Sequence, residues 1–172
     1  APSEEGLTLA LADPDLGVYL RPTTGGILVG GMEPECDPLE WLVRPEDAGQ
    51  HVTAATYEAQ SVRAARRVRN LTVPNRPTGI VGVYDVSTDW APIYDRTAHA
   101  GYYVAMGTSG NQFKNAPLAG QFLRALVDAA AAGVDHDRDP VHFTGPVTGR
   151  TIDLGAFSRL RSPTATSGTV MG

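Results

Sequence analysis

The sequence predicts an α+β fold in which a sheet rich in antiparallel strands is combined with two main helices. Short β-prone runs separated by a glycine-containing turn open the chain. Two longer segments, residues 53–70 and 116–132, repeat apolar residues with the helical period. A loop with two glycines joins an apolar run to the second of these segments. With 172 residues, 42% of them apolar, the chain is long enough for one core or two small ones.

The N-terminal half is expected to combine strands with one helix. Three strands are expected first, at residues 7–11, 17–21 and 27–30. A turn at residues 23–26 joins the second strand to the third. Residues 32–52 are rich in proline and acidic side chains, so we expect a loop with short helical turns, anchored by Trp41, Leu42 and Val43. Neither proline nor glycine interrupts the amphipathic pattern of residues 53–70, which predicts a helix.

The C-terminal half begins with a predicted buried strand at residues 79–86, where glycine alternates with β-branched or aromatic residues. The helix expected at residues 116–132 ends at Gly133, a typical stop. Its apolar face is formed by Leu118, Phe122, Leu123, Leu126 and Val127. Residues 135–161 are polar with a short strand or turn at 151–154, and residues 162–172 are expected to be frayed.

The loop before the second helix carries the clearest functional signal. Its two glycines let the backbone approach a ligand closely, and Asn115 and Pro117 suit the start of a helix. A helix start offers unpaired N–H groups and the positive end of a dipole to an anion. The loop therefore predicts an anion or cofactor contact, although the same residue types also serve turn geometry alone. It reads Gly107, Thr108, Ser109, Gly110, Asn111, Gln112, Phe113 and Lys114.

Composition excludes several other classes of function. The net charge of −5 gives no basic surplus for nucleic-acid binding, and the one arginine cluster, at residues 63–69, is expected to be a solvated helix face. No run approaches the roughly 18 apolar residues of a membrane helix, so no membrane partner is expected. The single cysteine, Cys36, rules out an internal disulfide and fits a cytoplasmic protein. Residues 135–139 include metal-ligand types, but neighbouring side chains diverge, so we expect an acidic loop and no metal site.

Three segments and the second predicted helix together resemble a known family. They are Gly82-Val83-Tyr84-Asp85-Val86-Ser87-Thr88-Asp89-Trp90-Ala91-Pro92-Ile93, the run 101–107 and the loop 107–114. In order and spacing they resemble the C-terminal part of flavin-dependent amine and amino-acid oxidoreductases of the D-amino-acid oxidase superfamily, nearest to the sarcosine-oxidase-like branch. The resemblance implies that residues 1–100 are part of the substrate domain, that 101–133 form the strand-loop-helix completing the FAD domain, and that 134–172 are a C-terminal tail.

The same resemblance implies that a partner segment is needed for FAD binding. In such enzymes an N-terminal Rossmann-type unit holds the adenosine half of FAD through a GxGxxG turn, and this sequence has no glycines with that spacing after a strand. We therefore expect the chain to be the C-terminal portion of a longer flavoprotein, working with a missing N-terminal FAD-binding domain. By itself it should bind FAD poorly and turn over no substrate. The alternative is a non-catalytic binding or scaffold module that has kept the substrate-domain sheet.

The activity implied is oxidation of a secondary or N-methyl amine or amino acid by hydride transfer to flavin. Residues 107–114 would then bind the cofactor, with the backbone N–H groups of residues 110–113 facing the pyrimidine edge of the flavin. Lys114 falls on the family's lysine that binds a substrate carboxylate, although Gln112 replaces a family glycine. Tyr84 matches the tyrosine that brackets the substrate. The plainer alternatives are a surface lysine and a core aromatic residue.

Two departures from the family pattern refine this expectation. Gly82 occupies the position of the cysteine that attaches flavin covalently in monomeric sarcosine oxidases, which implies a noncovalent FAD. Leu28 occupies the position of a lysine found in the oxidases, where a cation would favour superoxide-like charge at the flavin face. Its absence suggests a dehydrogenase that passes electrons to a carrier and not rapidly to O₂.

Overall fold

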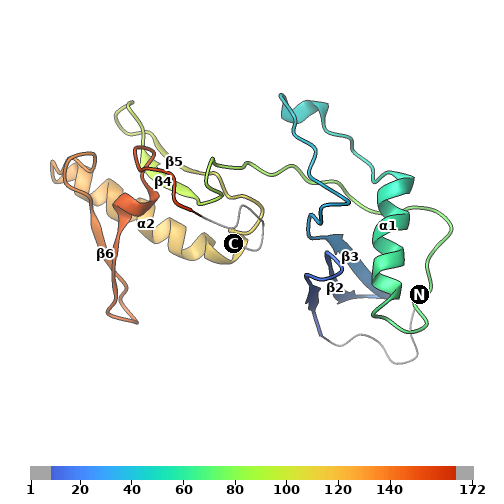
Figure 1. Cartoon of the computed structure of the whole chain (residues 1–172). Coiled ribbons are helices and arrows are strands. Elements are labelled where there is room, and N and C mark those ends of the chain that lie inside the picture. Colours follow the sequence, from blue (N-terminus) through green and yellow to red (C-terminus); the bar gives the residue numbers. More distant parts are fainter. Residues whose placement is uncertain (1–8, 166–172) are drawn as a thin grey trace. The chain divides into compact units, whose positions relative to one another are not determined.

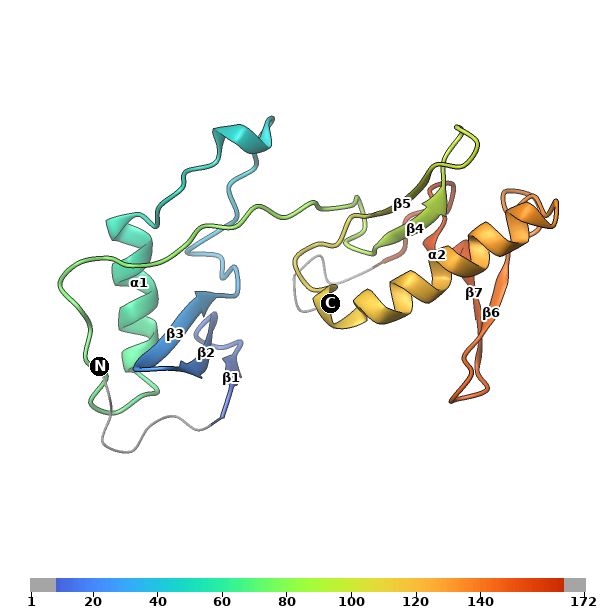
Figure 2. The same cartoon turned by 180° about the vertical axis from the view of Figure 1, so that it is seen from behind.

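The computed structural model describes residues 9–165. The chain forms two compact units that divide between Val83 and Tyr84, and Figures 1 and 2 show each unit from two sides. The described residues contain two α-helices and small antiparallel sheets of three, two and two strands. The predicted α+β class is therefore confirmed. Neither helix in this part of the chain is long and apolar enough to cross a membrane.

The first unit is an antiparallel three-stranded sheet with one helix beside it. The strands β1 (Leu11–Asp13), β2 (Val18–Thr23) and β3 (Gly26–Gly31) pair in chain order. Thr23 pairs with Gly26, so β2 and β3 form a hairpin with a two-residue turn in which Gly25 has a φ of +83°. Helix α1 (Ala54–Ala65) contacts β2 and β3, and the core holds Val18, Leu20 and Ala64. The strands predicted at residues 17–21 and 27–30 are confirmed. Residues 7 and 8 of the strand predicted at 7–11 lie outside the described residues, and of residues 9–11 only Leu11 lies in a strand, at the start of β1.

Helix α1 begins where the sequence predicts and ends earlier. The Thr53 side chain accepts a hydrogen bond from the backbone N–H of Thr56, which caps the first turn. After Ala65 the backbone continues in turns, and Asn70 adopts a φ of +58° that no helix accommodates. Arg66, Arg67 and Arg69 are exposed as predicted. Arg63 is not, because its side chain is 12% exposed and pairs with Asp37 at 2.7 Å.

Two predictions for the connecting segments are wrong. Trp41 and Val43, expected to anchor the loop, are 72% and 98% exposed, since the described part of this unit buries its apolar groups between α1 and the sheet without them. The loop does contain the predicted helical turn, the 3₁₀ helix η1 (Pro45–Asp47). Residues 79–86 form no strand, and Ile80 is 92% exposed. Their β-prone composition favours extended backbone, but no neighbouring strand in the described part of the chain pairs with them.

The second unit surrounds helix α2 (Ala116–Ala131). Strands β4 (Ile93–Arg96) and β5 (Tyr103–Met106) form a hairpin that contacts the helix, and β6 (His142–Thr144) and β7 (Thr151–Asp153) form another. The 3₁₀ helix η2 (Phe113–Asn115) leads into α2, and η3 (Leu154–Phe157) follows β7. The core contains Tyr94, Ala119, Phe122, Leu126 and Leu154. The ring of Phe122 lies 5.2 Å from that of Phe143 and 5.4 Å from that of Phe157.

The end of α2 follows the prediction closely. Gly133 has a φ of +82° and donates its N–H to the carbonyl of Ala130, while Val134 donates to Ala129. These two hydrogen bonds form a Schellman motif, which requires a left-handed residue and so favours glycine. Phe122 and Leu126 of the predicted apolar face are buried, whereas Leu118 and Val127 are 37% and 42% exposed.

The segment predicted to be a polar tail contributes to the core of the second unit. Leu154 is 1% exposed, and Phe143, Ile152 and Phe157 pack against the buried cluster. The short strand or turn predicted at residues 151–154 is confirmed by β7 and the start of η3. Apolar residues spaced along two short strands and a 3₁₀ turn have no helical period, which explains why the sequence did not indicate a core here. The expected assignment of residues 1–100, 101–133 and 134–172 to family domains stays a prediction, because it concerns roles and not the compact units.

Candidate functional site

The loop after β5 has a backbone that few residues adopt. Gly107, Ser109 and Gly110 have φ values of +65°, +51° and +78°. A left-handed conformation costs a non-glycine residue roughly 1 kcal/mol, and Ser109 adopts it while fully buried. The Ser109 hydroxyl donates to the Gly107 carbonyl at 3.2 Å, so its burial leaves that hydroxyl with a partner. Contacts from outside the loop must offset the remaining strain.

The main contact comes from Asp85, on the extended segment that precedes β4. Its Oδ1 atom accepts a hydrogen bond from the Thr108 N–H at 3.1 Å and another from the Thr108 hydroxyl. Its backbone carbonyl accepts from the Ser109 N–H at 3.1 Å. Burial by itself would raise the pKa of Asp85, but the hydrogen bonds from Thr108 outweigh it and lower that pKa below 3.8. Asp85 is therefore ionised and holds the loop through these hydrogen bonds.

Tyr84 lies against the same loop. A Cβ atom added to Gly110 would stand 2.7 Å from Cε1 of the Tyr84 ring, so only glycine allows the ring to approach the backbone this closely. The side chain of Tyr84 is 39% exposed, which sets aside the core-aromatic interpretation. The structure thus brings the predicted residue Tyr84 to the predicted loop, and its role toward a substrate stays a prediction.

The backbone donors of the loop fall into two groups. The N–H groups of Thr108, Ser109 and Asn111 donate to protein acceptors. Among residues 9–165, the N–H groups of Gly110, Gln112 and Phe113 have no acceptor. Three of the four backbone N–H groups predicted at residues 110–113 therefore have no protein acceptor among the described residues, whereas the N–H of Asn111 has one. A group of donors beside a positive helix end can bind an anion or another electron-rich ligand group.

Gln112 ties this loop to the core of the unit. Its Oε1 atom accepts from the Tyr94 hydroxyl at 3.2 Å and from the Asn115 side-chain amide at 2.6 Å, and its own amide donates to Asn111. The predicted capping role of Asn115 is wrong, because its side chain points to Gln112 and caps no N–H of α2. The residue that replaces the family glycine is therefore a structural link.

The two remaining loop side chains face outward. Phe113 is 97% exposed, and Lys114, also exposed, forms no ion pair or hydrogen bond with a described residue. The structure places Tyr84 against the turn at Gly110, whereas Lys114 stands in η2 at the entry to α2. Lys114 is the only lysine among the 172 residues, which makes it selectively addressable.

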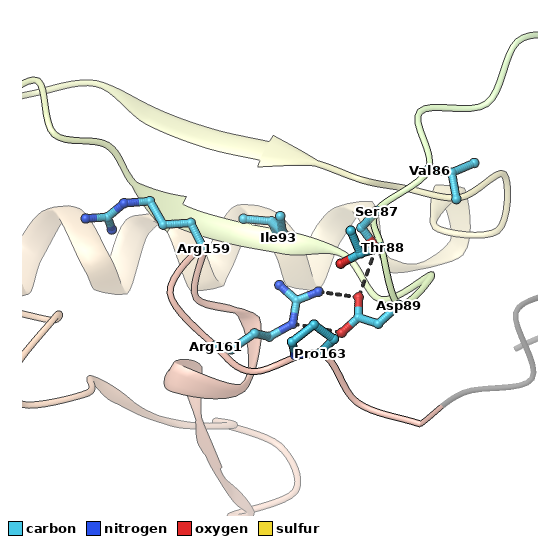
Figure 3. A pocket seen from close by; sticks show the side chains of 8 residues that line it. All are labelled: Val86, Ser87, Thr88, Asp89, Ile93, Arg159, Arg161 and Pro163. Carbon is cyan, nitrogen blue, oxygen red and sulfur yellow. Dashed lines mark hydrogen bonds and ion pairs between the residues drawn. The ribbon is translucent and has the colours of Figure 1, made fainter. Parts of the chain in front are cut away.

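A pocket of about 260 Å³ lies beside the segment that follows Asp85 (Figure 3). On its wall Asp89, whose side chain is 1% exposed, pairs with Arg161 through contacts of 2.6 Å to Nη2 and 3.3 Å to Nε. Burial raises the pKa of Asp89, but the hydrogen bond from Arg161 and others from Thr164, Ala91 and Ser87 more than compensate and hold that pKa well below its usual range. The charges on this wall are therefore paired within the protein. The lining residues are Val86, Ser87, Thr88, Asp89, Ile93, Arg159, Arg161 and Pro163.

The acidic segment 135–139 is also occupied by internal pairs. Asp135 lies 2.7 Å from Arg96, and Asp137 lies 2.7 Å from Arg159. Within residues 9–165 no three His, Cys, Asp or Glu side chains gather as a group that could hold a metal ion.

Sequence reasoning assigned no role to Asp85 and did not predict the Asp89–Arg161 pair. The partners of these carboxylates lie 23 and 72 residues away in the chain, so local patterns carry no signal for either contact. The left-handed residues of the loop were partly predictable, because glycines at positions 107 and 110 indicate them.

A comparison with protein families matches residues 2–126 to a family described as FAD dependent oxidoreductase, DAO. The matched range contains Tyr84, Asp85, the whole loop and the first part of α2. Searches among curated proteins and among solved structures gave no match.

Proposed function

The chain belongs to the FAD-dependent oxidoreductase family, and from this premise we propose that it is the C-terminal portion of an enzyme that oxidises the CH–NH bond of a secondary or N-methyl amine or amino acid with noncovalent FAD. The observation that carries the proposal is the strained turn at residues 107–110, followed by three backbone donors without acceptors among the described residues. FAD, when bound, would accept a hydride equivalent from the carbon next to the substrate nitrogen.

In this proposal the chain positions one edge of the cofactor. The N–H groups of Gly110, Gln112 and Phe113 donate to the ring edge that becomes electron-rich on reduction, and the start of α2 adds its dipole. These donors are held by the fold before the ligand arrives, so little reorganisation is needed during the reaction. The glycine at position 82, where a covalent link would need a cysteine, is consistent with a noncovalent cofactor.

Two side chains are proposed to hold the substrate. Lys114 is an exposed cation at the start of α2 without an internal counter-charge among the described residues, so it is available to a substrate carboxylate. Tyr84 presents a partly exposed ring next to Gly110 and would bracket the substrate carbon chain. Amine and amino-acid substrates follow from the resemblance of these two positions to the sarcosine-oxidase-like branch.

The proposal includes an N-terminal FAD-binding domain as a partner. The loop offers donors for one edge of the flavin, whereas FAD also carries a pyrophosphate and an adenosine that need their own binding groups. Leu28, in β3, supports a dehydrogenase over an oxidase, because an apolar side chain supplies no cation for reaction with O₂. Fast reoxidation of the reduced protein by O₂ in stopped flow would reject this last part.

The test uses the natural reading frame that contains this chain. The purified protein should carry FAD, and an N-methyl amino acid should bleach the flavin absorption anaerobically. Lys114→Met should raise KM for the amino acid about tenfold or more, because a charged hydrogen bond to its carboxylate is lost. KM for an N-methyl amine without a carboxylate should stay unchanged. Arg124→Met, which removes another exposed cation of this unit, is the control. A protein with no bound FAD would reject the proposal and favour the scaffold module.

A further inference from the structure

We propose that Asp85 is the positioning residue of the cofactor loop, and that its carboxylate holds residues 107–110 in the binding conformation before FAD arrives. This inference rests on the proposed function. It concerns a residue that touches the loop and acts on the cofactor only through it.

The contacts of Asp85 all point to this loop. Oδ1 accepts from both the N–H and the hydroxyl of Thr108, and the backbone carbonyl accepts from the N–H of Ser109. These bonds occupy the two residues that lie between the left-handed Gly107 and Gly110. Asp85 forms no ion pair within residues 9–165, so its charge is balanced by the loop donors and not by a salt bridge.

Tyr84, the residue before Asp85, contacts the next residue of the turn, Gly110. The ring of Tyr84 lies on Gly110, where a Cβ would be only 2.7 Å from Cε1. Residues 84 and 85 thus fix the loop at Thr108, Ser109 and Gly110. The Gly110 N–H, which has no acceptor among the described residues, comes directly after the two N–H groups that donate to Asp85. The contacts with Asp85 therefore determine where the first N–H group available to a ligand lies.

Residues 107–110 have few other hydrogen bonds that keep this shape. They are the Ser109 hydroxyl to the Gly107 carbonyl and the Asn111 N–H to the Thr108 carbonyl, both at 3.2 Å, whereas Gln112 fixes the loop only from Asn111 onward. Without the Asp85 carboxylate, Thr108 loses its acceptor and only the backbone hydrogen bond from Ser109 to residue 85 remains. The strained Ser109 would then relax toward a right-handed conformation, and binding FAD would have to order the loop again. Asparagine at position 85 keeps an oxygen acceptor for Thr108, whereas alanine keeps none.

The first experiment needs no flavin. Amide hydrogen exchange of Thr108 and Ser109 is measured in the full chain for the native protein, Asp85→Asn, Asp85→Ala and the control Asp128→Asn, which changes an exposed carboxylate of α2. The alanine variant should exchange the Thr108 amide about tenfold faster or more, since its charged hydrogen bond is lost. The Ser109 amide should also exchange faster, because the turn around it opens, although its own acceptor, the backbone carbonyl of residue 85, remains. The asparagine variant and the control should stay within a few fold of the native rate. The Phe122 amide in the α2 core is the internal reference for global unfolding.

The second experiment measures FAD dissociation constants in the natural reading frame. Affinity should decrease in the order native, Asp85→Asn, Asp85→Ala, with about tenfold or more between native and alanine. The rescue by asparagine separates positioning from general destabilisation. Unchanged exchange at Thr108 and Ser109 in the alanine variant overturns the inference even where FAD binds. Faster exchange in a protein that binds no FAD rejects the proposed function, and with it the role of Asp85 toward a cofactor.

Discussion

Replacing Asp89 with alanine would leave the guanidinium of Arg161 buried without its counter-charge. The side chains of Asp89 and Arg161 are 1% and 10% exposed, and the shorter contact between them is 2.6 Å. Asp89 also accepts from the Thr164 N–H at 3.1 Å and the Ala91 N–H at 3.2 Å. The substitution therefore removes one charge and leaves several buried donors without acceptors.

The expected cost follows from this geometry. Removing one partner of a buried ion pair costs about 3–5 kcal/mol of unfolding free energy. Arg161 keeps two carbonyl acceptors in the variant, Ala91 at 3.0 Å and Ser158 at 3.1 Å, so we expect the lower end, about 3 kcal/mol. The double variant Asp89→Ala, Arg161→Met buries no unpaired charge and should cost less than the sum of the two single changes.

Urea unfolding of the full chain measures this cost. The chain has two tryptophans, so Trp41→Phe leaves Trp90, next to Asp89, as the fluorescence reporter of the second unit. Asp128→Asn, which removes a 67% exposed carboxylate 3.5 Å from Arg124, is the control and should change the free energy by less than about 0.5 kcal/mol. A loss below about 1 kcal/mol for Asp89→Ala, or additive effects in the double variant, would refute the reasoning.

Three further predictions concern the same unit. Phe122→Ala should cost about 3–5 kcal/mol in urea unfolding, because the buried ring contacts three other aromatic rings. Gly133→Ala should destabilise the unit by roughly 1 kcal/mol and lower Tm because of its φ of +82°, whereas Gly120→Ala in the open middle of α2 should raise Tm. The hydrogen bond from Arg159 lowers the pKa of Asp137 to about 2, so its contribution, on the order of 1–2 kcal/mol after solvent screening, is complete at neutral pH and lost as pH falls from about 5 to about 2. Asp137→Asn should flatten that part of the acid profile measured by circular dichroism.

The elements with strong local signals were predictable. The period of apolar residues located α2, and Gly133 identified its end, since both depend on residues within one turn of each other. The hairpin of β2 and β3 followed from a glycine turn for the same reason. Residues 79–86 show the limit of this reasoning, because β-prone composition forms a strand only where another strand pairs with it.

By itself, the sequence determined the fold class, the ends of α2 and the loop whose glycines allow a left-handed turn. Only the tertiary structure decided that Asp85 holds this loop, that Tyr84 lies on Gly110, and that the backbone N–H of Asn111 already has a protein acceptor. It also decided that Leu154 belongs to a core, against which Phe143, Ile152 and Phe157 pack, and that Arg161 pairs with Asp89. Helix and strand propensities and helix caps depend on residues close together in the chain. A buried ion pair, or a carboxylate that holds a loop as Asp85 does, depends on which distant segments fold beside each other.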